Sequence, residues 1–580
     1  MRASFVAVLA ACVAGCDAAG FKTVGSSGCA AQMLFVPPFT DNVVFLDNYH
    51  PNYGGPGVDL KTGKHSGNPY KTTDDHWVMA TEYNWKTNEL RKLSPKSNTF
   101  CSAGSFLADG TMLNLAGSEP DEWQANLGKN VMEGFDKIRT FAPGPCKGNC
   151  AMDIVEHSQT LQSKRWYPTT STLLNGDVLV VGGSNVGLLV INEASVNVPT
   201  YEIVKSDLSA DKKPVTLPYL EFTEKENLNF NKSFNLYPIL IPLPNSRQAD
   251  EIFSIVGNKA FIWDYTKDKL VSELPDTPLQ PRNFPSSASV VLLPLKAPDF
   301  KPTVLLCGGS STDVPDPQAL DDCYTINPSD ENPKWEPTDN LPNGGQTMTD
   351  AILLPDGKVL LINGAHKGSA GGWMADDPVF KPLIYDHSAV AGKRFTSMPA
   401  TDVPRLYHSV ASLLPSGEVI VAGSNPDVFY NNVGRVLDSY PYFNNNGHRA
   451  VLVQQQEKTS LHPTEYRVEK FSPTYMDAKS RPAIKTGPED NTIRFKETFT
   501  ITLEAVEGKD ITARLINPGF RTHGLGMDQR SVELQVRKGS LNNQLSITAP
   551  PNPTVMVAGV YMLFIAVDGV PSEAIWVKLS

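Results

Sequence analysis

STLLNGDVLVVGGS, residues 171–184, combines an apolar run, an Asn-Gly turn and a second apolar run that ends in small residues. Two apolar segments joined by such a turn are typical of a β-hairpin. Three further copies keep the pattern closely: FLADGTMLNLAGS (106–118), DAILLPDGKVLLINGA (350–365) and ASLLPSGEVIVAGS (411–424). Looser copies with longer turns occupy residues 33–48, 237–258 and 289–310. The sequence is therefore built on a diverged hairpin repeat.

The spacing of the copies predicts a closed ring of blades. The copies end near residues 48, 117, 183, 258, 309, 364 and 423. Gaps of roughly 50–75 residues are in the range of kelch-like propeller blades with loop insertions. Seven units fall within the ~4–8 blades of closed propellers. We therefore expect a seven-bladed kelch-like β-propeller over residues 20–477.

The C-terminal part of the chain follows a different pattern. Residues 478–580 lack the repeat and carry short alternating apolar runs, among them TFTITLEAV, SVELQVRKG and VMVAGVYMLFIAV. Several short strands in about 100 residues are typical of an Ig-like β-sandwich. A stretch rich in Pro, Lys and Asp, residues 477–490, marks the boundary between the two domains. The predicted fold class is all-β.

Composition and charge exclude several classes of function. The 580 residues exceed the ~250–300 at which a single core stops growing, which agrees with more than one domain. Lys and Arg number 51 and Asp and Glu 62, so the net charge is 51 − 62 = −11. Such a chain binds nucleic acid or anionic membranes poorly. No apolar stretch beyond the N-terminus is long enough to span a bilayer. We expect a monomer with no nucleic-acid partner and no membrane span.

The N-terminus resembles a targeting segment. Residues 1–19 have a basic residue, then an apolar run and small residues, the layout of a secretory signal peptide. We expect cleavage near residues 16–20, although Val13-Ala14-Gly15-Cys16 also fits a bacterial lipoprotein box. The protein is therefore predicted to be secreted and extracellular. Asn231-Lys232-Ser233 is a lone glycosylation sequon, a triplet that often arises by chance.

Six cysteines remain outside the predicted signal peptide. In an oxidising compartment, close pairs form disulfides, and this predicts two bridges: Cys146/Cys150 and Cys307/Cys323. Cys29 and Cys101 have no partner nearby in the sequence, and the simplest interpretation is that they pair with each other.

A propeller scaffold does not define a function, so the function must come from a site. Three segments are unusual for strands and loops: Arg165-Trp166-Tyr167-Pro168, Arg405-Leu406-Tyr407-His408 and Asn517-Pro518-Gly519-Phe520-Arg521-Thr522-His523-Gly524. An Arg before a hairpin is also explained as a blade-packing motif that the repeat reuses. The related segment Arg282-Asn283-Phe284-Pro285 favours this explanation, because it has the Arg and an aromatic residue but neither Tyr nor His. A lone His is also more often a hydrogen-bonded residue than a ligand.

Five motifs, in order and across both domains, give a specific resemblance. They are Thr99-Phe100-Cys101-Ser102-Ala103-Gly104, Arg165-Trp166-Tyr167, Arg405-Leu406-Tyr407-His408, Thr464-Glu465-Tyr466-Arg467-Val468-Glu469 and Thr522-His523-Gly524. The chain resembles the copper radical oxidases of the glyoxal oxidase and galactose oxidase family, and glyoxal oxidase more closely. This family combines a seven-bladed propeller with a galactose-oxidase-like early-set Ig-like domain, the architecture that the repeats predict independently.

The resemblance implies one mononuclear copper site. By the motif match, the copper ligands would be Tyr167, Tyr407, His408 and His523. Cys101 would be joined through its sulfur to the ring of Tyr167, which forms a radical cofactor from the protein's own side chains. Tyr407 would be the weak axial ligand and the base, and the Tyr167 radical would remove the hydrogen atom from carbon. His523 would arrive from the C-terminal domain on a loop along the propeller axis.

The chemistry explains why these residue types are needed. Oxidation of an alcohol or a hydrated aldehyde removes two electrons and two protons, and copper cycling between Cu(II) and Cu(I) accepts only one electron. A thioether-substituted phenol is easier to oxidise than plain tyrosine and can therefore accept the second electron. Two imidazoles and phenolate oxygen suit Cu(II). With Cys101 in this role, Cys29 is left as a buried free thiol.

Two departures from galactose oxidase bear on the substrate. The tryptophan that covers the cross-linked ring there is replaced by Asn185, after Gly182-Gly183-Ser184. Trp166 adjoins Tyr167, but on a strand it would point the opposite way, so we expect a structural role for it. No carbohydrate-binding module appears before the repeats. These observations favour small aldehydes such as glyoxal or methylglyoxal, taken as hydrates and oxidised to carboxylic acids while O2 becomes H2O2.

Two other functions stay open. A primary-alcohol or galactose-type oxidase would use the same site. A non-catalytic secreted propeller that binds carbohydrate or protein would not need the four ligand-type residues, and all four are present. No G-x-S-x-G or H-E-x-x-H motif supports a hydrolase. A peroxidase that consumes H2O2 is a candidate partner of the oxidase.

Overall fold

The computed structural model describes most of the chain. The described residues are 19–73, 75–119, 131–142, 153–187, 192–209, 213–225, 230, 233–245, 247–312, 317–372, 374–426, 441–443, 449–451, 462–504, 508–539 and 543–580. The predicted signal peptide up to residue 18, Cys146, Cys150 and the sequon at Asn231 lie outside them. Within the described part, β-strands dominate and the one α-helix, α1, spans Pro218–Lys225.

Seven four-stranded blades form the propeller, as the repeat predicts. The strands of each blade are given from the axis outward. Blade 1 contains β2 (Met33–Phe35), β3 (Asn42–Leu46), β4 (Ala80–Asn84) and β5 (Leu90–Lys92), and blade 2 contains β6 (Ala103–Phe106), β7 (Met112–Leu115), β8 (Lys137–Phe141) and β9 (Val155–Thr160). Blade 3 contains β10 (Thr169–Thr172), β11 (Val178–Val181), β12 (Thr200–Val204) and β13 (Val215–Thr216).

Blades 4 to 6 follow the same antiparallel order. Blade 4 contains β14 (Ile239–Pro242), β15 (Glu251–Val256), β16 (Lys259–Asp264) and β17 (Lys269–Glu273), and blade 5 contains β18 (Ser289–Leu292), β20 (Val304–Cys307), β21 (Cys323–Ile326) and β22 (Glu336–Pro337). Blade 6 contains β23 (Asp350–Leu353), β24 (Val359–Ile362), β27 (Leu383–Tyr385) and β28 (Phe395–Ser397). Smaller elements outside the blades are β19 (Leu295–Lys296), β25 (Ala365–Gly368), β26 (Ala375–Pro378), β31 (Pro441–Phe443) and β32 (Arg449–Val451).

Blade 7 joins the two ends of the propeller chain. It contains β29 (Ser409–Leu413), β30 (Val419–Gly423), β33 (Arg467–Ser472) and, at its outer edge, the N-terminal strand β1 (Gly20–Ser26). β1 pairs antiparallel with β33, with Gly20 opposite Ser472. Because this blade combines strands from both ends of the propeller chain, the pairing closes the ring.

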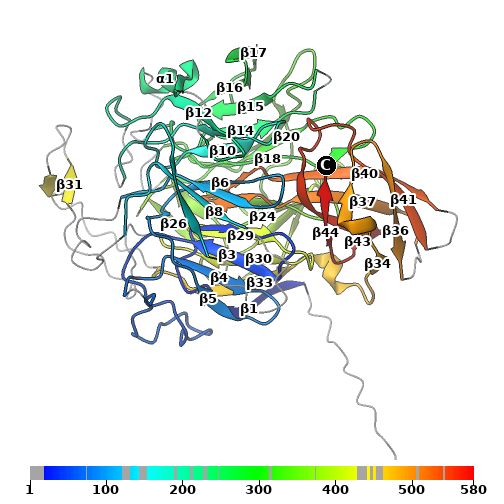
Figure 1. Cartoon of the computed structure of the whole chain (residues 1–580), viewed down its shortest axis with the longest axis horizontal. Coiled ribbons are helices and arrows are strands. Elements are labelled where there is room, and N and C mark those ends of the chain that lie inside the picture. Colours follow the sequence, from blue (N-terminus) through cyan, green and yellow to red (C-terminus); the bar gives the residue numbers. More distant parts are fainter. Residues whose placement is uncertain are drawn as a thin grey trace, which may run out of the picture.

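The C-terminal domain is the predicted Ig-like sandwich, drawn in orange to red on one side of the ring (Figure 1). The short helix η2 (Thr474–Asp477) precedes the domain, and a second short helix, η3 (Glu489–Asn491), lies between its first two strands. The strands are β34 (Ile484–Thr486), β35 (Thr492–Ile493), β36 (Thr498–Leu503), β37 (Ile511–Asn517), β40 (Arg530–Lys538), β41 (Gln544–Thr548), β42 (Gly559–Val567), β43 (Val570–Pro571) and β44 (Ile575–Leu579). A continuous apolar core joins it to blades 4 and 5, with Ile239 and Leu292 in the same cluster as Val532 and Leu563.

One hairpin of the C-terminal domain enters the propeller. Its strands β38 (Phe520–Thr522) and β39 (Leu525–Met527) add to the inner edge of blade 1, where β38 pairs with β2. The hairpin also contacts the innermost strands β6, β10, β18, β23 and β29 of five other blades. It therefore lies on the propeller axis, where the hairpin repeat alone predicts no strand.

The innermost strands begin with a repeated backbone feature. Just before each of them, one residue has a left-handed backbone with φ between 43° and 65°: Ala31, Cys101, Tyr167, Tyr237, Ser287, Met348 and His408. Neighbouring members are linked through the main chain, since Tyr167 donates its N–H to Cys101 O at 3.1 Å and Tyr237 donates to Tyr167 O at 2.8 Å. The repeat thus places seven side chains around one end of the axis.

Two further expectations concern stability and membranes. Cys307 and Cys323 form the predicted disulfide across β20 and β21. In the part of the chain that the structure describes, no helix has the length and apolar character needed to cross a bilayer.

Candidate metal centre

Four side chains predicted as ligands converge at this end of the axis. The phenol oxygens of Tyr167 and Tyr407 are 2.5 Å apart, and Nε2 of His523 is 3.2 Å from the Tyr167 oxygen. The ring of His408 stacks on that of Tyr407 with centroids 3.8 Å apart and lies 4.8 Å from the ring of His523. Blade 3, blade 7 and the axial hairpin therefore build one site.

The two imidazoles are oriented by their other ring nitrogens. Nδ1 of His408 lies 3.0 Å from the carbonyl oxygen of Asn425, and it must donate because a carbonyl only accepts. Nδ1 of His523 lies 2.6 Å from the Thr522 hydroxyl, which in turn donates to Gln32 O at 3.2 Å. Both rings thus carry their proton on Nδ1 and present an Nε2 lone pair, the tautomer that a metal ligand needs.

Burial controls the charge of these groups. It lowers the pKa of His408 to about 3 and that of His523 well below the usual value, so both imidazoles are neutral and able to donate lone pairs. Burial also raises the pKa of Tyr167 and Tyr407 well above the usual value. A cation at this point would favour the opposite, phenolate form of the tyrosines.

The site fits a metal ion. His408 Nε2 is buried and makes no hydrogen bond within the described structure, and such an orphaned atom is costly unless a ligand takes it. The donor atoms of Cys101, His408 and His523 lie within 4.8 Å of one another. Two imidazole nitrogens with two phenol oxygens form a donor set that suits copper.

Cys101 lies beside the donors as a buried free thiol. Its Sγ is 3.7 Å from His523 Nε2. Burial raises the pKa of the thiol well above the usual value, and a hydrogen-bonding contact with Tyr167 opposes this. Cys29 is also free and buried, with Sγ 3.7 Å from Thr81 Oγ1. The simplest sequence interpretation, a Cys29–Cys101 disulfide, is therefore wrong.

Trp166 lies against Tyr167, and the expectation that it points the opposite way is wrong. The two rings meet edge to face with centroids 4.4 Å apart, and Trp166 also packs on Phe100. The alternation of side chains holds only in extended backbone, and Tyr167 has φ of +62°. The Asn185 side chain donates to Ser195 O at 3.1 Å.

Two aromatic neighbours of Tyr167 were not found from the sequence. The ring of Tyr237 lies 4.7 Å from that of Tyr167, and its hydroxyl donates to Ser102 O at 3.2 Å. The ring of Phe284 lies 5.0 Å from Tyr167 on another side. A signal was present for Phe284, because it stands two residues after Arg282, as Tyr167 stands two residues after Arg165. With Trp166, these rings shield the Tyr167 phenol from water.

The axial hairpin holds His523 at a tight turn. Thr522 pairs with Leu525, so His523 and Gly524 are the two turn residues, with φ of 50° and 75°. Positive φ at both positions is the requirement of a type I′ turn, which Gly meets without strain. Below the turn, Arg521 Nη2 bonds to Asp350 of blade 6 at 3.0 Å, and both side chains are fully buried. This ion pair fixes the hairpin against the ring.

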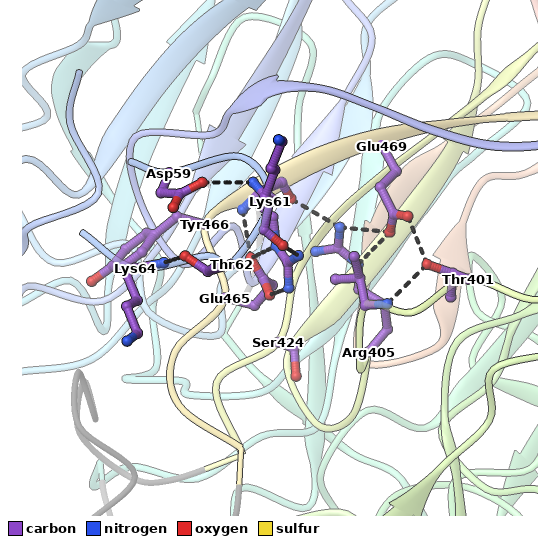
Figure 2. A network of polar contacts seen from close by, with 12 residues as sticks. Asp59, Lys61, Thr62, Lys64, Thr401, Arg405, Ser424, Glu465, Tyr466 and Glu469 are labelled. Atoms are coloured by element: carbon purple, nitrogen blue, oxygen red, sulfur yellow. Dashed lines mark hydrogen bonds and ion pairs between the residues drawn. The ribbon is translucent and has the colours of Figure 1, made fainter. Parts of the chain in front are cut away.

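The arginines before the hairpins anchor the blades, as their repetition predicts. Arg405 donates to Gly423 O at 2.7 Å and pairs with Glu469, which also accepts from Thr401 (Figure 2). Arg165 makes the equivalent bonds to Gly182 O and Glu202. The guanidinium groups therefore position Tyr167 and Tyr407 without touching the donors.

The fold and the donor set define a candidate metal site on a propeller axis. Residues 36–441 match the family model described as Glyoxal oxidase N-terminus, and residues 481–579 match Galactose oxidase-like, Early set domain. The chain therefore belongs to the glyoxal oxidase family.

Individual relatives agree with this assignment. "Aldehyde oxidase GLOX" of Vitis pseudoreticulata is 34% identical over 512 residues, which cover 85% of this chain and 84% of that protein. "Aldehyde oxidase GLOX1" of Arabidopsis thaliana is 28% identical and covers 96% and 83%. A solved fungal alcohol oxidase in complex with copper is 17% identical, covers 97% of this chain and all of its own, and superposes with a TM-score of 0.69. At that identity the superposition supports the fold alone.

Proposed function

We propose that the protein is a copper radical oxidase that binds one copper ion through Tyr167, Tyr407, His408 and His523. The observation that carries the proposal is the convergence of these donors around the orphaned Nε2 of His408, from segments that lie far apart in the sequence. Copper, when bound, supplies a one-electron acceptor and stabilises phenolate oxygen.

The second electron acceptor is the ring of Tyr167, joined to the sulfur of Cys101. Forming this thioether makes one S–C bond and removes the thiol hydrogen and one ring hydrogen, and O2 accepts the two electrons and two protons. Cys101 is a free thiol that contacts Tyr167, which is the arrangement needed before this reaction. The rings of Trp166, Tyr237 and Phe284 keep water from the phenoxyl radical.

The substrates proposed are small aldehydes, glyoxal and methylglyoxal among them, that react as hydrates. The Tyr407 oxygen accepts the proton of one hydroxyl, and the Tyr167 radical removes the hydrogen atom from carbon. Because the two tyrosine oxygens are 2.5 Å apart, both can reach the O–H and C–H of a single carbon. The hydrate loses two electrons and two protons to become the carboxylic acid, and O2 gains them to become H2O2. The names of the plant relatives support aldehydes.

Copper loading of the purified protein tests the site. We expect one copper per chain, a radical absorption band after mild oxidation and, once the disulfides are reduced, an intact mass lower by two hydrogens than that of the mature sequence. Copper binding without either radical band or mass loss would contradict the thioether cofactor.

An oxygen-consumption panel tests the substrate class, with glyoxal and methylglyoxal against primary alcohols and galactose and with H2O2 measured by a coupled peroxidase. Faster turnover of alcohols or galactose than of glyoxal would assign the protein to the alcohol-oxidase alternative.

We also propose that the protein is secreted, with residues 1–19 removed. The Cys307–Cys323 disulfide supports an oxidising compartment. N-terminal sequencing of protein from the culture medium should begin near residues 16–20, and retention of residue 1 would contradict the proposal.

A further inference from the structure

A small cavity lies directly beside the metal centre on the propeller axis. It is bounded by His523 and Leu525 of the axial hairpin and by Tyr237, Phe284 and Ser287 of blades 4 and 5. The space open to the centres of water-sized molecules is about 20 Å³. This is enough for one or two small molecules and too little for an organic substrate.

A larger cavity lies below it, where the C-terminal domain packs on the propeller. Its volume is about 50 Å³, and it is lined by residues of β14 and β18, by Asp528 and Arg530 after the hairpin, and by Thr554 and Tyr561. Its rim includes Pro553, Val557 and Ala558, which are only partly buried, so this end opens toward solvent.

The two cavities meet at three aliphatic side chains. Ile239 of β14, Val290 of β18 and Leu525 of β39 line both of them. The axial hairpin contacts the innermost strand of every blade except blade 4, whose innermost strand, β14, it approaches least. The two cavities therefore adjoin along the axis, from the domain junction to His523, and together they are the candidate channel.

Polar side chains on the channel walls are already engaged by protein partners. Arg282 bonds to Gly308 O and pairs with Asp322. The amide of Asn283 donates to Phe234 O and Leu236 O, and Arg530 donates to three carbonyls, those of Pro242, Thr554 and Val555. A polar molecule would find few free partners along the walls, whereas a small apolar molecule loses nothing by leaving water.

We propose that this channel carries dioxygen to the metal centre. The inference rests on the proposed oxidase function and adds a separate route for its second substrate. Dioxygen is neutral, apolar and small enough for the narrow upper cavity, and the channel ends at residues that contact Tyr167. With this route, dioxygen reaches the centre without displacing the organic substrate.

Xenon pressurisation of copper-free crystals tests the channel without any turnover, because xenon binds apolar cavities. We expect a xenon atom between Ile239, Val290 and Leu525. A channel filled by ordered water instead, or xenon absent from it, would overturn the proposal.

Steady-state kinetics tests the same residues in the copper-loaded enzyme. Val290→Phe should raise KM for O2 about tenfold and leave copper content and KM for the organic substrate unchanged. Val290→Thr, which keeps the side-chain volume, is the matched control and should keep the original KM for O2. An unchanged KM for O2 in folded, copper-loaded Val290→Phe would contradict the proposal. If Val290→Phe does not fold, Val290→Leu provides a smaller obstruction, with a smaller rise expected.

The two proposals fail in different ways. If xenon occupies the channel but no alcohol or aldehyde drives O2 consumption, the proposed function is wrong. If O2 is consumed normally but neither xenon nor Val290→Phe has the expected effect, the channel is wrong and the oxidase stands.

Discussion

Blades 3 and 7 carry chemistry-bearing residues, and blade 5 uses the same anchor without them. Arg165, Arg405 and Arg282 are all fully buried, and each donates to the main-chain carbonyl of a glycine at the end of its blade's second strand and pairs with an acidic residue. Two residues after each arginine, the side chain turns toward the axis: Tyr167, Tyr407 and Phe284. The arginine anchor thus recurs in all three blades, and the identity of the residue two positions later decides whether the side chain there can bind a metal.

The largest effect should come from making blade 3 like blade 5. Tyr167→Phe removes one oxygen donor and the radical site while keeping the ring, so turnover should fall by about 10⁴-fold or more with little loss of stability. Electron paramagnetic resonance and steady-state rates check this. Phe284→Tyr is the reciprocal control and should keep the activity, because the original four donors remain. Residual radical in Tyr167→Phe would assign the redox role to another residue.

Removing the sulfur tests the thioether separately from copper binding. Cys101→Ser should keep copper but lose most turnover, by about 10³-fold, because an unsubstituted phenol is harder to oxidise. Cys29→Ser is the matched control, since Cys29 is an equally buried free thiol outside the donor set, and it should keep full turnover per bound copper. Equal activity of the two variants would remove the role of Cys101.

The hydroxyl that orients His523 should have a smaller effect. Thr522→Val removes the acceptor of the Nδ1 proton, and loss of such a partner typically costs about 10–100-fold in metal affinity. Copper titration in competition with a chelator measures this. Thr522→Ser restores the hydroxyl and should restore the affinity, whereas a purely structural role for the threonine methyl would leave Thr522→Ser as weak as Thr522→Val.

The smallest effect on catalysis is expected in blade 5. Arg282→Gln leaves Asp322 without its buried partner and should lower the free energy of unfolding by about 3 kcal/mol, with copper affinity unchanged in the folded protein. Arg405→Gln should destabilise similarly but also weaken copper binding, because Tyr407 and His408 follow directly. Denaturant unfolding with copper titration separates the two. Equal copper affinity in both variants would show that the anchors do not position the donors.

The repeat was readable because its signals are local. Each hairpin has its own turn and its own apolar runs, so the blades, their number and the Cys307–Cys323 bridge could be predicted without knowledge of the fold. The donors could be predicted from matching motifs, since Tyr167, Tyr407, His408 and His523 stand in short characteristic segments. Phe284 could have been found by comparing the residues two positions after Arg165 and Arg282, but its segment was interpreted only as a packing motif.

What the sequence by itself determined about this protein is the ring of seven blades, the second β-domain and the residue types of a metal centre. Only the tertiary structure decided how these residues meet: that Trp166 turns onto Tyr167, that Tyr237 joins it, that Cys29 and Cys101 stay apart, and that a cavity lies beside the hairpin. The physical reason is that these features depend on left-handed backbone and on contacts between distant segments, to which no local pattern is sensitive.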